Sequence, residues 1–296
     1  MAVGCLQARR AYERAVADWA GGAFDWKEAE QAGEEARRLF ATMIRADAGE
    51  VAIVPSVSTA AGTIAVQLGP AKQGDNILVA DLEFSSNVFP WLSLRDIGYE
   101  VRVIPSTDGM VPSDSYAAHA DKQTRLIAVS AVQSSTGYRT NLSEHGHIAH
   151  RSGGWLFVDA CQAAGAVSVD VRRDDIDFLA TASHKFLLGS RGMGYLFVRR
   201  ELIEGCRPVL PGWKAASKPM ESFYGPTMEL SRSASRFDTS LTWFAASLRE
   251  SPSASFNTLA FREFWTTTRS CRHDCTTNCW GPVFRSNPFR STIARP

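Results

Sequence analysis

Hydrophobic and polar positions repeat with two different periods along the chain. Two stretches near the start, about Leu6–Ala20 and Trp26–Ile44, carry apolar residues at the spacing of amphipathic helices. After them, short apolar runs are separated by stretches with helical spacing, and near-continuous apolar runs are typical of strands buried on both faces. The pattern predicts a helical segment over residues 1–45, followed by an α/β domain over residues 46–248.

The predicted strands and helices alternate. The strands are EVAIVPS, DNILVAD, YEVRVIPS, TRLIAVSAVQ, WLFVDA, DIDFLATAS and GMGYLFVRR. The helices between them are STAAGTIAVQLG, with Ser58 or Thr59 as its N-cap, then SNVFPWLSLRDIG, PSDSYAAHAD and LSEHGHIAHRSG. Such alternation predicts a mainly parallel sheet covered by helices.

Ligands of such sheets bind beyond the carboxyl ends of the strands. Residues whose side chains could bind a ligand or take part in a reaction lie at these strand ends, so we expect them to form one common site. They are Thr59, Glu83–Asn87, Ser130–Ser134, Asp159 and Lys185.

Composition narrows the class of protein. The chain has 296 residues, of which 45% are hydrophobic and 21% charged, with a formal net charge of +1. A nearly neutral protein has no general attraction to nucleic acids or membrane surfaces, and no apolar run reaches the length of a transmembrane helix. The opening MAVGCLQARRAYERAVADWA lacks the apolar core of a signal peptide. We therefore expect a cytoplasmic protein.

Cysteines and histidines do not predict a metal site. Cys5, Cys161 and Cys206 lie far apart and are expected to be reduced. The gaps in CRHDCTTNC (Cys271–Cys279) fit no standard zinc motif. The histidines of EHGHIAH lack the i, i+4 spacing of a zinc-binding helix.

The end of the chain differs from the rest. From Ser251 to Pro296 there are six Arg, no Lys and two acidic residues, with neither helical nor strand periodicity. Arginine without lysine, with sporadic Cys and Trp, is typical of GC-rich DNA translated out of frame. We therefore hypothesise that residues 249–296 are an atypical tail created by a frameshift between about Ala246 and Ser255, which sequencing of the gene would test. The alternative is an unusual but genuine tail.

Lys185 and Asp159 are the strongest candidates for chemistry. Lys185 follows a buried strand and Ser183-His184, and precedes a glycine-rich loop. Partial desolvation there favours the neutral, nucleophilic amine, which suits a lysine that forms a Schiff base. Asp159 ends another buried strand, and a buried carboxylate needs a cation beside it to stay ionised.

Two further residues complete the pattern. Gln162, three residues after Asp159, can bond a neighbouring polar group of the same ligand, and Thr59 stands at a helix N-terminus where backbone N–H groups can bind a phosphate. Pyridoxal phosphate has a ring nitrogen, a phenolic oxygen, a phosphate and an aldehyde that need these partners in turn.

The motifs also resemble a known family. Val158–Arg200, with D-x-x-Q and H-K, together with SVSTAAG, DLEFSSNVFPW and AVQSSTGYRTNL, is similar to the class V aminotransferase group of fold-type I pyridoxal-phosphate enzymes, which includes cysteine desulfurases. The resemblance covers roughly Ala11 to Leu248. It implies the large domain of that fold, with the small C-terminal domain missing or replaced, and a homodimer.

The resemblance implies a role for each matching residue. Lys185 would form the Schiff base and move the substrate's Cα proton, and Asp159 would pair with the ring nitrogen. Gln162, helped by Ser134, would bond the phenolic oxygen, and Phe84 would stack on the ring. The phosphate would be held by Thr59, the N–H of Ala60, His184 and Ser183, the last in place of a hydroxyl residue that relatives have where this chain has Ala182. In SRFDTSLTWF, Thr239 or Ser240 would reach the phosphate of a partner subunit.

The reaction class stays open at this point. The resemblance implies an amino-acid substrate and transamination or related Cα chemistry, with desulfurase, lyase or epimerase activity as alternatives. Phe84 stands where desulfurases usually carry histidine, and a phenyl ring cannot transfer a proton. A truncated pseudoenzyme that only binds the cofactor is a further alternative. A Rossmann-type nucleotide binder is disfavoured because IVPSVSTAAGT lacks G-x-G-x-x-G.

Overall fold

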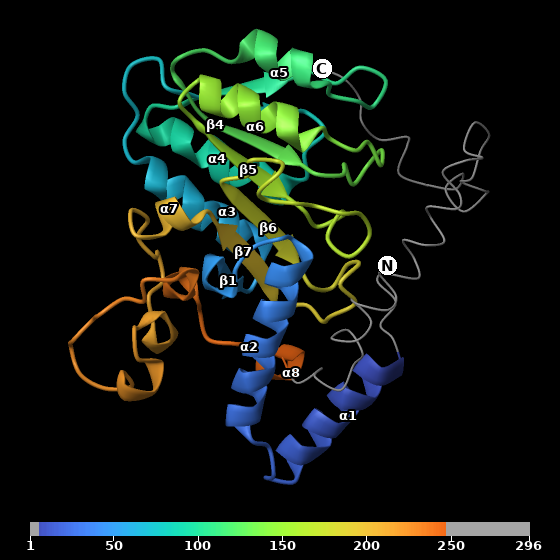
Figure 1. Cartoon of the computed structure of the whole chain (residues 1–296), viewed down its shortest axis with the longest axis vertical. Coiled ribbons are helices and arrows are strands. Elements are labelled where there is room, and N and C mark those ends of the chain that lie inside the picture. Colours follow the sequence, from blue (N-terminus) through green and yellow to red (C-terminus); the bar gives the residue numbers. More distant parts are fainter. Residues whose placement is uncertain (1–5, 247–296) are drawn as a thin grey trace.

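A twisted seven-stranded sheet forms the centre of the computed structural model, which describes residues 6–246 (Figure 1). The strand order is β1-β7-β6-β5-β4-β2-β3, and neighbouring strands are parallel except that β7 runs antiparallel to both β1 and β6. The strands are β1 (Val51–Val54), β2 (Asn76–Ala80), β3 (Glu100–Ile104), β4 (Thr124–Ser130), β5 (Trp155–Asp159), β6 (Phe178–Ala182) and β7 (Gly194–Val198).

Helices cover both faces of this sheet. Residues of α2, α5 and α6 pack on one face and residues of α3, α4 and α7 on the other, and Figure 1 shows α2 and α6 in front of the strands. The helices are α1 (Leu6–Ala20), α2 (Trp26–Met43), α3 (Val57–Ala65), α4 (Phe89–Leu92), α5 (Ser113–His119), α6 (Leu142–Arg151), α7 (Arg200–Ile203) and α8 (Trp243–Ala246).

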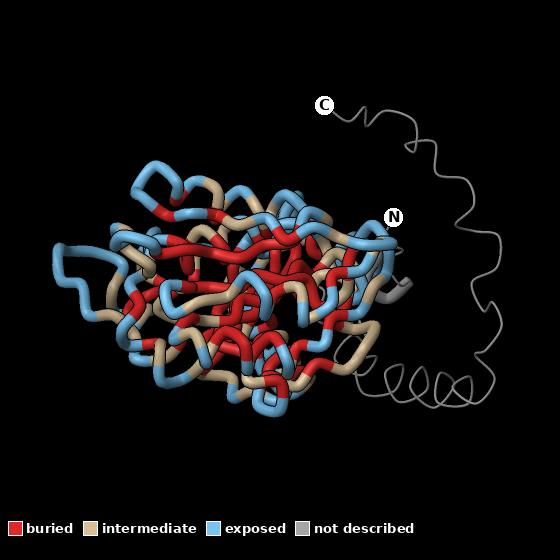
Figure 2. Tube along the Cα trace, turned by 90° about the horizontal axis from the view of Figure 1, so that it is seen from above, coloured by how far each residue is buried: buried red, intermediate tan, exposed pale blue. Residues whose placement is uncertain are grey.

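Side chains of the strands alternate between two hydrophobic cores. Along β1, Val51 and Ile53 belong to the core under α2 and α6, whereas Ala52 and Val54 belong to the core under α3. Every residue of β1 is buried, because helices cover both faces of this strand. The buried residues accordingly fill the middle of the molecule and the exposed ones its rim (Figure 2). This two-sided burial confirms the predicted fold class and explains the near-continuous apolar runs.

The prediction of one continuous helix over SNVFPWLSLRDIG is wrong. The chain forms a 3₁₀ turn at Ser85–Asn87, then the short helix α4, then a second 3₁₀ turn at Ser93–Ile97. Pro90 lies in the first turn of α4, where its missing N–H leaves no helical hydrogen bond unmade. A proline is tolerated only at such a start, so the helix cannot continue through it from Ser86.

The predicted N-terminal helices are confirmed as α1 and α2. The second of them contributes to the main core, since the ring of Phe40 stacks on Tyr195 of β7 with centroids 4.3 Å apart. The predicted boundary at residue 45 stays a prediction, and the tail over residues 249–296, with Cys271–Cys279, lies outside the described residues. Among residues 6–246, no helix combines the length and apolar character needed to cross a membrane.

A partly buried charge cluster joins the end of α6 to β5. Nδ1 of His150 lies 2.8 Å from Asp175 and Nε2 lies 2.8 Å from Asp177, so carboxylates face both ring nitrogens. Arg199 binds the same two carboxylates, at 2.6 and 3.0 Å. Asp177 also accepts the N–H of Leu156 at the start of β5 (2.7 Å). The cluster therefore holds the charged form of the imidazole in place.

The stability of the chain is expected to depend on pH through His150. The hydrogen bond with Asp177, and then the charges of Asp177 and Asp175, raise the pKa of His150 above 6.5 against the effect of burial. A raised folded-state pKa gives stability that is fully present below about pH 6.5 and is lost as the pH rises through the folded value. We expect His150→Gln to lower the free energy of unfolding more at pH 6 than at pH 9, measured by urea titration.

His147 offers the matched control for this experiment. It lies on the same helix but is exposed, and its Nδ1 faces the carbonyl of Ser143. His147→Gln should therefore change the unfolding free energy little and equally at both pH values. An effect of His150→Gln that is the same at pH 6 and pH 9 would contradict the assignment.

Candidate active site

Asp159 ends β5 at the middle of the sheet. In register it lies opposite Ser130 of β4 and Ala180 of β6, and its side chain is 5% exposed. One carboxylate oxygen accepts the N–H of Cys161 (2.8 Å), and Asp159 makes no ion pair within residues 6–246. Burial raises the pKa of Asp159 to about 6, although the positive charge of Lys185 acts in the opposite direction. Such a carboxylate is suited to a cationic ring nitrogen.

Lys185 lies in a tight loop beyond β6. Its side chain is half-buried, and within the described part of the chain its amine has no hydrogen-bond or ion-pair partner. Leu188 in this loop adopts a left-handed conformation (φ 58°), and a Cβ on Gly189 would lie 2.8 Å from Ser183. The compact loop fixes the backbone below Lys185 and leaves its amine available for a ligand.

Ser183 and His184 occupy different environments. The hydroxyl of Ser183 lies 2.7 Å from the carbonyl of Ser190 and 2.8 Å from that of Met193, so it is engaged in shaping the loop. His184 is half-buried, and burial, then the charges of Lys185 and Arg191, lower its pKa. The lowered pKa favours the neutral imidazole. The phosphate-binding role of both residues stays a prediction.

The N-cap of α3 lies two or three residues earlier than the sequence suggested. Ser56, and neither Ser58 nor Thr59, is the N-cap, and its hydroxyl accepts the N–H of Thr59 (3.1 Å). The N–H of Ala60 donates to the carbonyl of Ser56 (3.1 Å). The predicted N-cap is therefore wrong, because Ser56 already adopts the extended backbone of a cap.

This capping changes which N–H groups are available to an anion. Within the described residues, the N–H groups of Val57 and Ser58 make no hydrogen bond. Free N–H groups of a first helical turn are the usual ligands of a phosphate. Ser58 therefore joins Thr59 as a candidate phosphate ligand, although the sequence suggested Ser58 only as a helix cap. Its exposed hydroxyl donates to Ser86 (3.0 Å).

Gln162 lies in the turn that follows β5. It is half-buried, and its amide makes no hydrogen bond with the rest of the described chain. Gly165 in the same turn has φ +88°, and a Cβ there would lie 2.5 Å from the carbonyl of Phe186. Only glycine allows this approach. The turn that carries Gln162 therefore packs directly on the backbone just beyond Lys185.

Phe84 and Ser134 are at the surface of the site. Phe84 lies in the loop after β2 and is 56% exposed, so its ring is accessible to a ligand. Ser134 is exposed in the turn between Gln133 and Tyr138, whose backbone groups bond each other (2.9 Å). The structure thus places both residues on loops at the carboxyl edge of the sheet.

Glu83 belongs to the strand-end candidates Glu83–Asn87, but the sequence assigned it no role of its own. It is buried, and four donors from three residues reach its two oxygens. Its charge acts on Asp159 and raises the pKa of that group. The signal was an acidic residue in an otherwise apolar and neutral turn directly before Phe84.

Thr239 and Ser240 lie away from the start of α3 in the same chain. Thr239 is half-buried and Ser240 exposed. The nearby Thr242 donates to the carbonyl of Gly192 (3.0 Å), in the loop that follows Lys185. No contact within the described residues brings Ser240 to the other predicted phosphate ligands, so its role toward a partner subunit stays a prediction.

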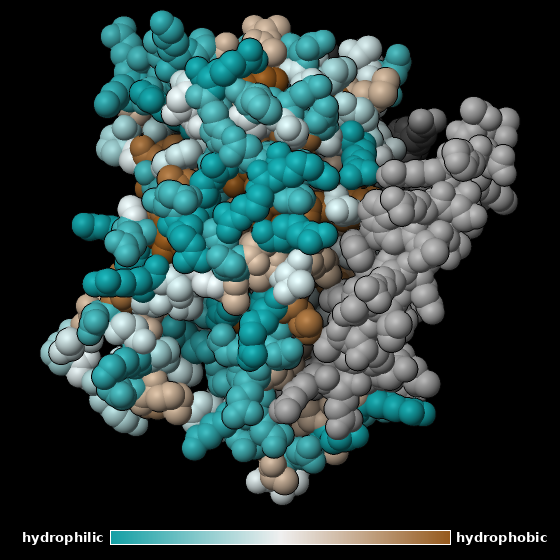
Figure 3. All heavy atoms as spheres, viewed as in Figure 1, coloured by the Kyte–Doolittle hydropathy of each residue, from teal (hydrophilic) through white to brown (hydrophobic). Residues whose placement is uncertain are grey.

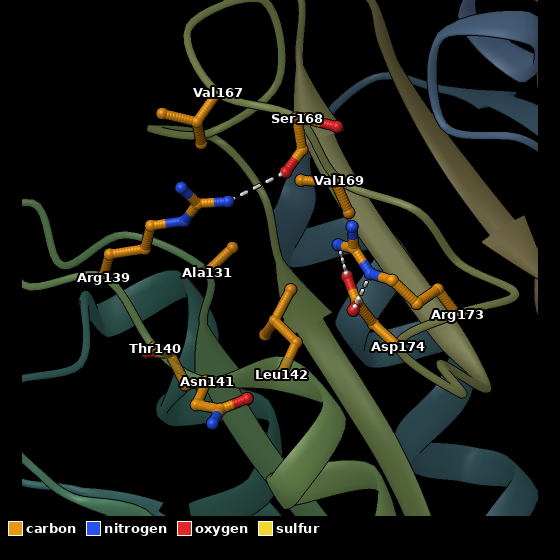
Figure 4. Close-up of a pocket in the computed structure, with 10 residues that line it drawn as sticks. All are labelled: Ala131, Arg139, Thr140, Asn141, Leu142, Val167, Ser168, Val169, Arg173 and Asp174. Carbon is orange, nitrogen blue, oxygen red and sulfur yellow. Dashed lines mark hydrogen bonds and ion pairs between the residues drawn. The ribbon is translucent and has the colours of Figure 1, made fainter. Parts of the chain in front are cut away.

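A separate cavity of about 290 Å³ opens beside α6 (Figure 4). Arg139 and Arg173 flank it, but Arg139 already donates to the carbonyl of Ser168 (3.2 Å) and Arg173 binds Asp174 at 2.8 Å. None of the predicted site residues lines this cavity. Charged and polar residues predominate on this face of the molecule, and apolar patches are small (Figure 3).

The site fits pyridoxal phosphate because several of its polar groups have no partner among the described residues. Asp159 has no bonded cation, Lys185 and Gln162 have no polar partner in the described chain, and two N–H groups at the start of α3 are free. The ring face of Phe84 is exposed. These are the groups that a ring nitrogen, an aldehyde, a phenolic oxygen, a phosphate and an aromatic ring require. Within residues 6–246, no group of three metal-ligating side chains lies together.

Comparison with known proteins agrees with this geometry. The chain is 37% identical over 200 residues to the uncharacterized aminotransferase YcbU of Bacillus subtilis (strain 168), covering 68% of this chain and 53% of that protein. It is 34% identical over 180 residues to a probable cysteine desulfurase of Methanothermobacter thermautotrophicus, covering 60% and 45%. The chain thus spans about half the length of the curated relatives it matches.

Solved structures share the fold. A variant of the enzyme C-DES with glycine covalently linked to its pyridoxal-phosphate cofactor has a TM-score of 0.75 and 21% identity, over 90% of this chain and 72% of that one. The family model for class V aminotransferases matches residues 10–246. This match confirms the predicted family and, with the fit of the site, pyridoxal phosphate as its cofactor. The chain belongs to the class V aminotransferase family.

Proposed function

We propose that this chain is a pyridoxal-phosphate enzyme that acts on an amino acid at Lys185, by transamination or related chemistry at Cα. The observation that carries the proposal is a buried carboxylate, Asp159, near a half-buried amine, Lys185, neither of which makes an ion pair within residues 6–246. The two lie close enough for the charge of Lys185 to act on Asp159.

Each residue has a stated task in this proposal. Bound pyridoxal phosphate supplies an electron-withdrawing ring to which an amino group can be attached. Asp159 holds the proton on the ring nitrogen, and the burial that raises its pKa strengthens that bond in a site of low polarity. Lys185 takes the proton from the substrate's Cα and returns it, which is general acid–base catalysis by an amine.

Other residues bind and orient. The free N–H groups of Val57 and Ser58, with the hydroxyl of Thr59, bind the phosphate at the start of α3. Gln162 donates to the phenolic oxygen, and Phe84 covers one face of the ring and excludes water from it. The working unit is a homodimer, as the resemblance implies, in which Ser240 approaches the partner's phosphate.

The loop between α7 and α8 supports an interface. Exposed apolar side chains gather along residues 209–228, including Leu210 (65% exposed), Tyr224 (95%) and Met228 (68%). The loop projects from the body at the lower left of Figure 1. Large apolar side chains that project into solvent together are typical of a surface that another chain covers.

Desulfurase or lyase activity on a sulfur amino acid is the second candidate. Matching relatives named as cysteine desulfurases favour it. Against it stands Phe84, since its ring cannot supply the proton transfer that the resemblance assigns to histidine at this place. Release of sulfide or persulfide from cysteine would favour the second candidate, and release of a 2-oxo acid the first.

The test is to locate the attached cofactor in the full chain. The protein is purified with pyridoxal phosphate, reduced with borohydride, and digested for peptide mapping. We expect the label on Lys185, and a change in the visible spectrum when the substrate amino acid is added. Lys214, buried in an ion pair with Glu30, should stay unlabelled. A folded chain that takes up no cofactor would refute the proposal, and cofactor without response to any amino acid would identify a pseudoenzyme.

A further inference from the structure

A second buried carboxylate lies next to the predicted cofactor site. Glu83 follows β2 and is 9% exposed. Its Oε1 accepts the N–H of Ser130 (2.7 Å) and the amide of Gln133 (2.6 Å). Its Oε2 accepts the amide of Asn87 (2.8 Å) and the hydroxyl of Ser130 (2.5 Å). All four donors point toward one side chain, which is the arrangement that a buried carboxylate requires.

These bonds join two loops of the site. Asn87, fully buried, donates its own N–H to the carbonyl of Phe84 (2.7 Å) and accepts the indole N–H of Trp91 (3.3 Å). Glu83 thereby closes a turn on which Phe84 is held with its ring exposed. The backbone of Phe84 is fixed through Asn87, and Asn87 is fixed through Glu83.

The other loop begins at Ser130 and Gln133. Gln133 is 3% exposed, and within the described residues its amide oxygen has no hydrogen-bond partner. The bond from its amide nitrogen to Glu83 therefore sets the position of this side chain, and Ser134 is the next residue. Ser130 lies opposite Asp159 in the β4–β5 register, and Ala131 donates its N–H to the carbonyl of Asp159 (2.8 Å).

We propose that Glu83 is the positioning residue of this site: it holds the loop of Phe84 and the loop of Ser134 against the end of β4, and places a second negative charge behind Asp159. The inference rests on the proposed function, because the role of Phe84, Ser134 and Asp159 is to bind the cofactor. Glu83 itself acts through these neighbours and makes no contact with the reacting atoms.

The negative charge of Glu83 affects the pKa of Asp159. Burial, and then the charge of Glu83, raise the pKa of Asp159, while the N–H and the side chain of Cys161 and the charge of Lys185 lower it. Burial also raises the pKa of Glu83 against its four hydrogen bonds, so its charge acts on Asp159 only above that raised pKa. The titratable groups around Asp159 are thus Glu83, Cys161 and Lys185, and buried Tyr116 faces Glu83 from α5. Removal of the charge at Glu83 should let Asp159 ionise at lower pH. A ring cation is then captured at lower pH as well.

The test compares Glu83→Gln and Glu83→Asp with the unchanged chain. Each protein is titrated with pyridoxal phosphate from pH 5 to pH 9, and binding is followed by quenching of tryptophan fluorescence and by absorbance. For Glu83→Gln we expect about a tenfold weaker affinity at pH 8, because an amide cannot accept all four hydrogen bonds. We also expect the pH midpoint of uptake to move to lower pH.

Glu83→Asp separates the two effects. It keeps the charge but shortens the side chain, so the affinity should fall while the midpoint stays close to that of the unchanged chain. Glu201→Gln, which removes an exposed carboxylate on α7, should change neither quantity. If Glu83→Gln does not fold, Ser130→Ala, which removes a single hydroxyl donor, should still weaken binding several-fold.

The outcomes distinguish this inference from the proposed function. If the unchanged chain takes up no pyridoxal phosphate, the proposed function fails. If it binds the cofactor and both Glu83 variants bind it with equal affinity and midpoint, Glu83 has no positioning role and this inference alone is overturned. A loss of affinity in Glu83→Gln without any change in midpoint would refute the role of the second charge.

Discussion

Replacement of Lys185 by alanine should abolish covalent attachment of pyridoxal phosphate and lower turnover by roughly 10³-fold or more, because one amine supplies both the attachment and the proton transfer. The amine has no other partner in the described chain, so its loss leaves no buried group unpaired and the fold should persist. Reversible binding should also persist, since Asp159 and the start of α3 are unchanged. Borohydride labelling and equilibrium titration measure the two properties separately.

Lys122→Ala serves as the matched control, because this lysine is exposed and precedes β4. It should leave labelling, affinity and turnover unchanged. Retention of borohydride-stable cofactor by the Lys185→Ala chain would show that another amine carries the cofactor.

Asp238→Ala should lower the free energy of unfolding by about 3–5 kcal/mol, the usual cost of removing one partner of a buried ion pair. Asp238 is paired with Arg37 of α2 at 2.5 Å, and the side chains are 1% and 5% exposed. Asp238 also accepts the N–H of Ile53 in β1 (2.8 Å). The alanine variant removes two acceptor oxygens from the buried guanidinium and one from the buried N–H of Ile53. Urea unfolding of the full chain measures the loss.

The exposed pair of Lys218 and Glu221 provides the comparison. Its atoms lie 3.1 Å apart, but both side chains are 70% exposed. Water screens such a pair, so Lys218→Ala should cost less than about 1 kcal/mol. If Lys218→Ala and Asp238→Ala lowered the free energy of unfolding equally, the ion pair between Arg37 of α2 and Asp238 would not stabilise the fold.

The spacing of apolar residues along the chain predicted the helices and strands well wherever burial repeats regularly along an element. The runs at β4 and β5 are apolar throughout because both faces of each strand are covered. Prediction failed at α4, where Pro90 ends one turn and starts another, and at the start of α3. Ser56, Ser58 and Thr59 are all good cap residues, and only backbone conformation decides between them.

The sequence could propose some residues of the candidate site but not all of them. Spacing pointed to Asp159, Gln162 and Lys185, because strand ends in a parallel sheet meet at one edge. Glu83 was among the strand-end candidates, but its role could not be predicted, since a single acidic residue in a loop is ordinary. Its importance comes from donors 4, 47 and 50 positions away in the sequence.

The sequence by itself determined the class of fold, the family and the cofactor, because strand ends and the D-x-x-Q and H-K motifs are local patterns. It also predicted Lys185 as the lysine that carries the cofactor. The tertiary structure decided which groups remain unpaired in the assembled chain. Among residues 6–246, Asp159 makes no ion pair, the N–H groups of Val57 and Ser58 make no hydrogen bond, and Glu83 accepts four hydrogen bonds. Hydrogen-bond satisfaction depends on neighbours from distant segments, and these meet only when the sheet forms.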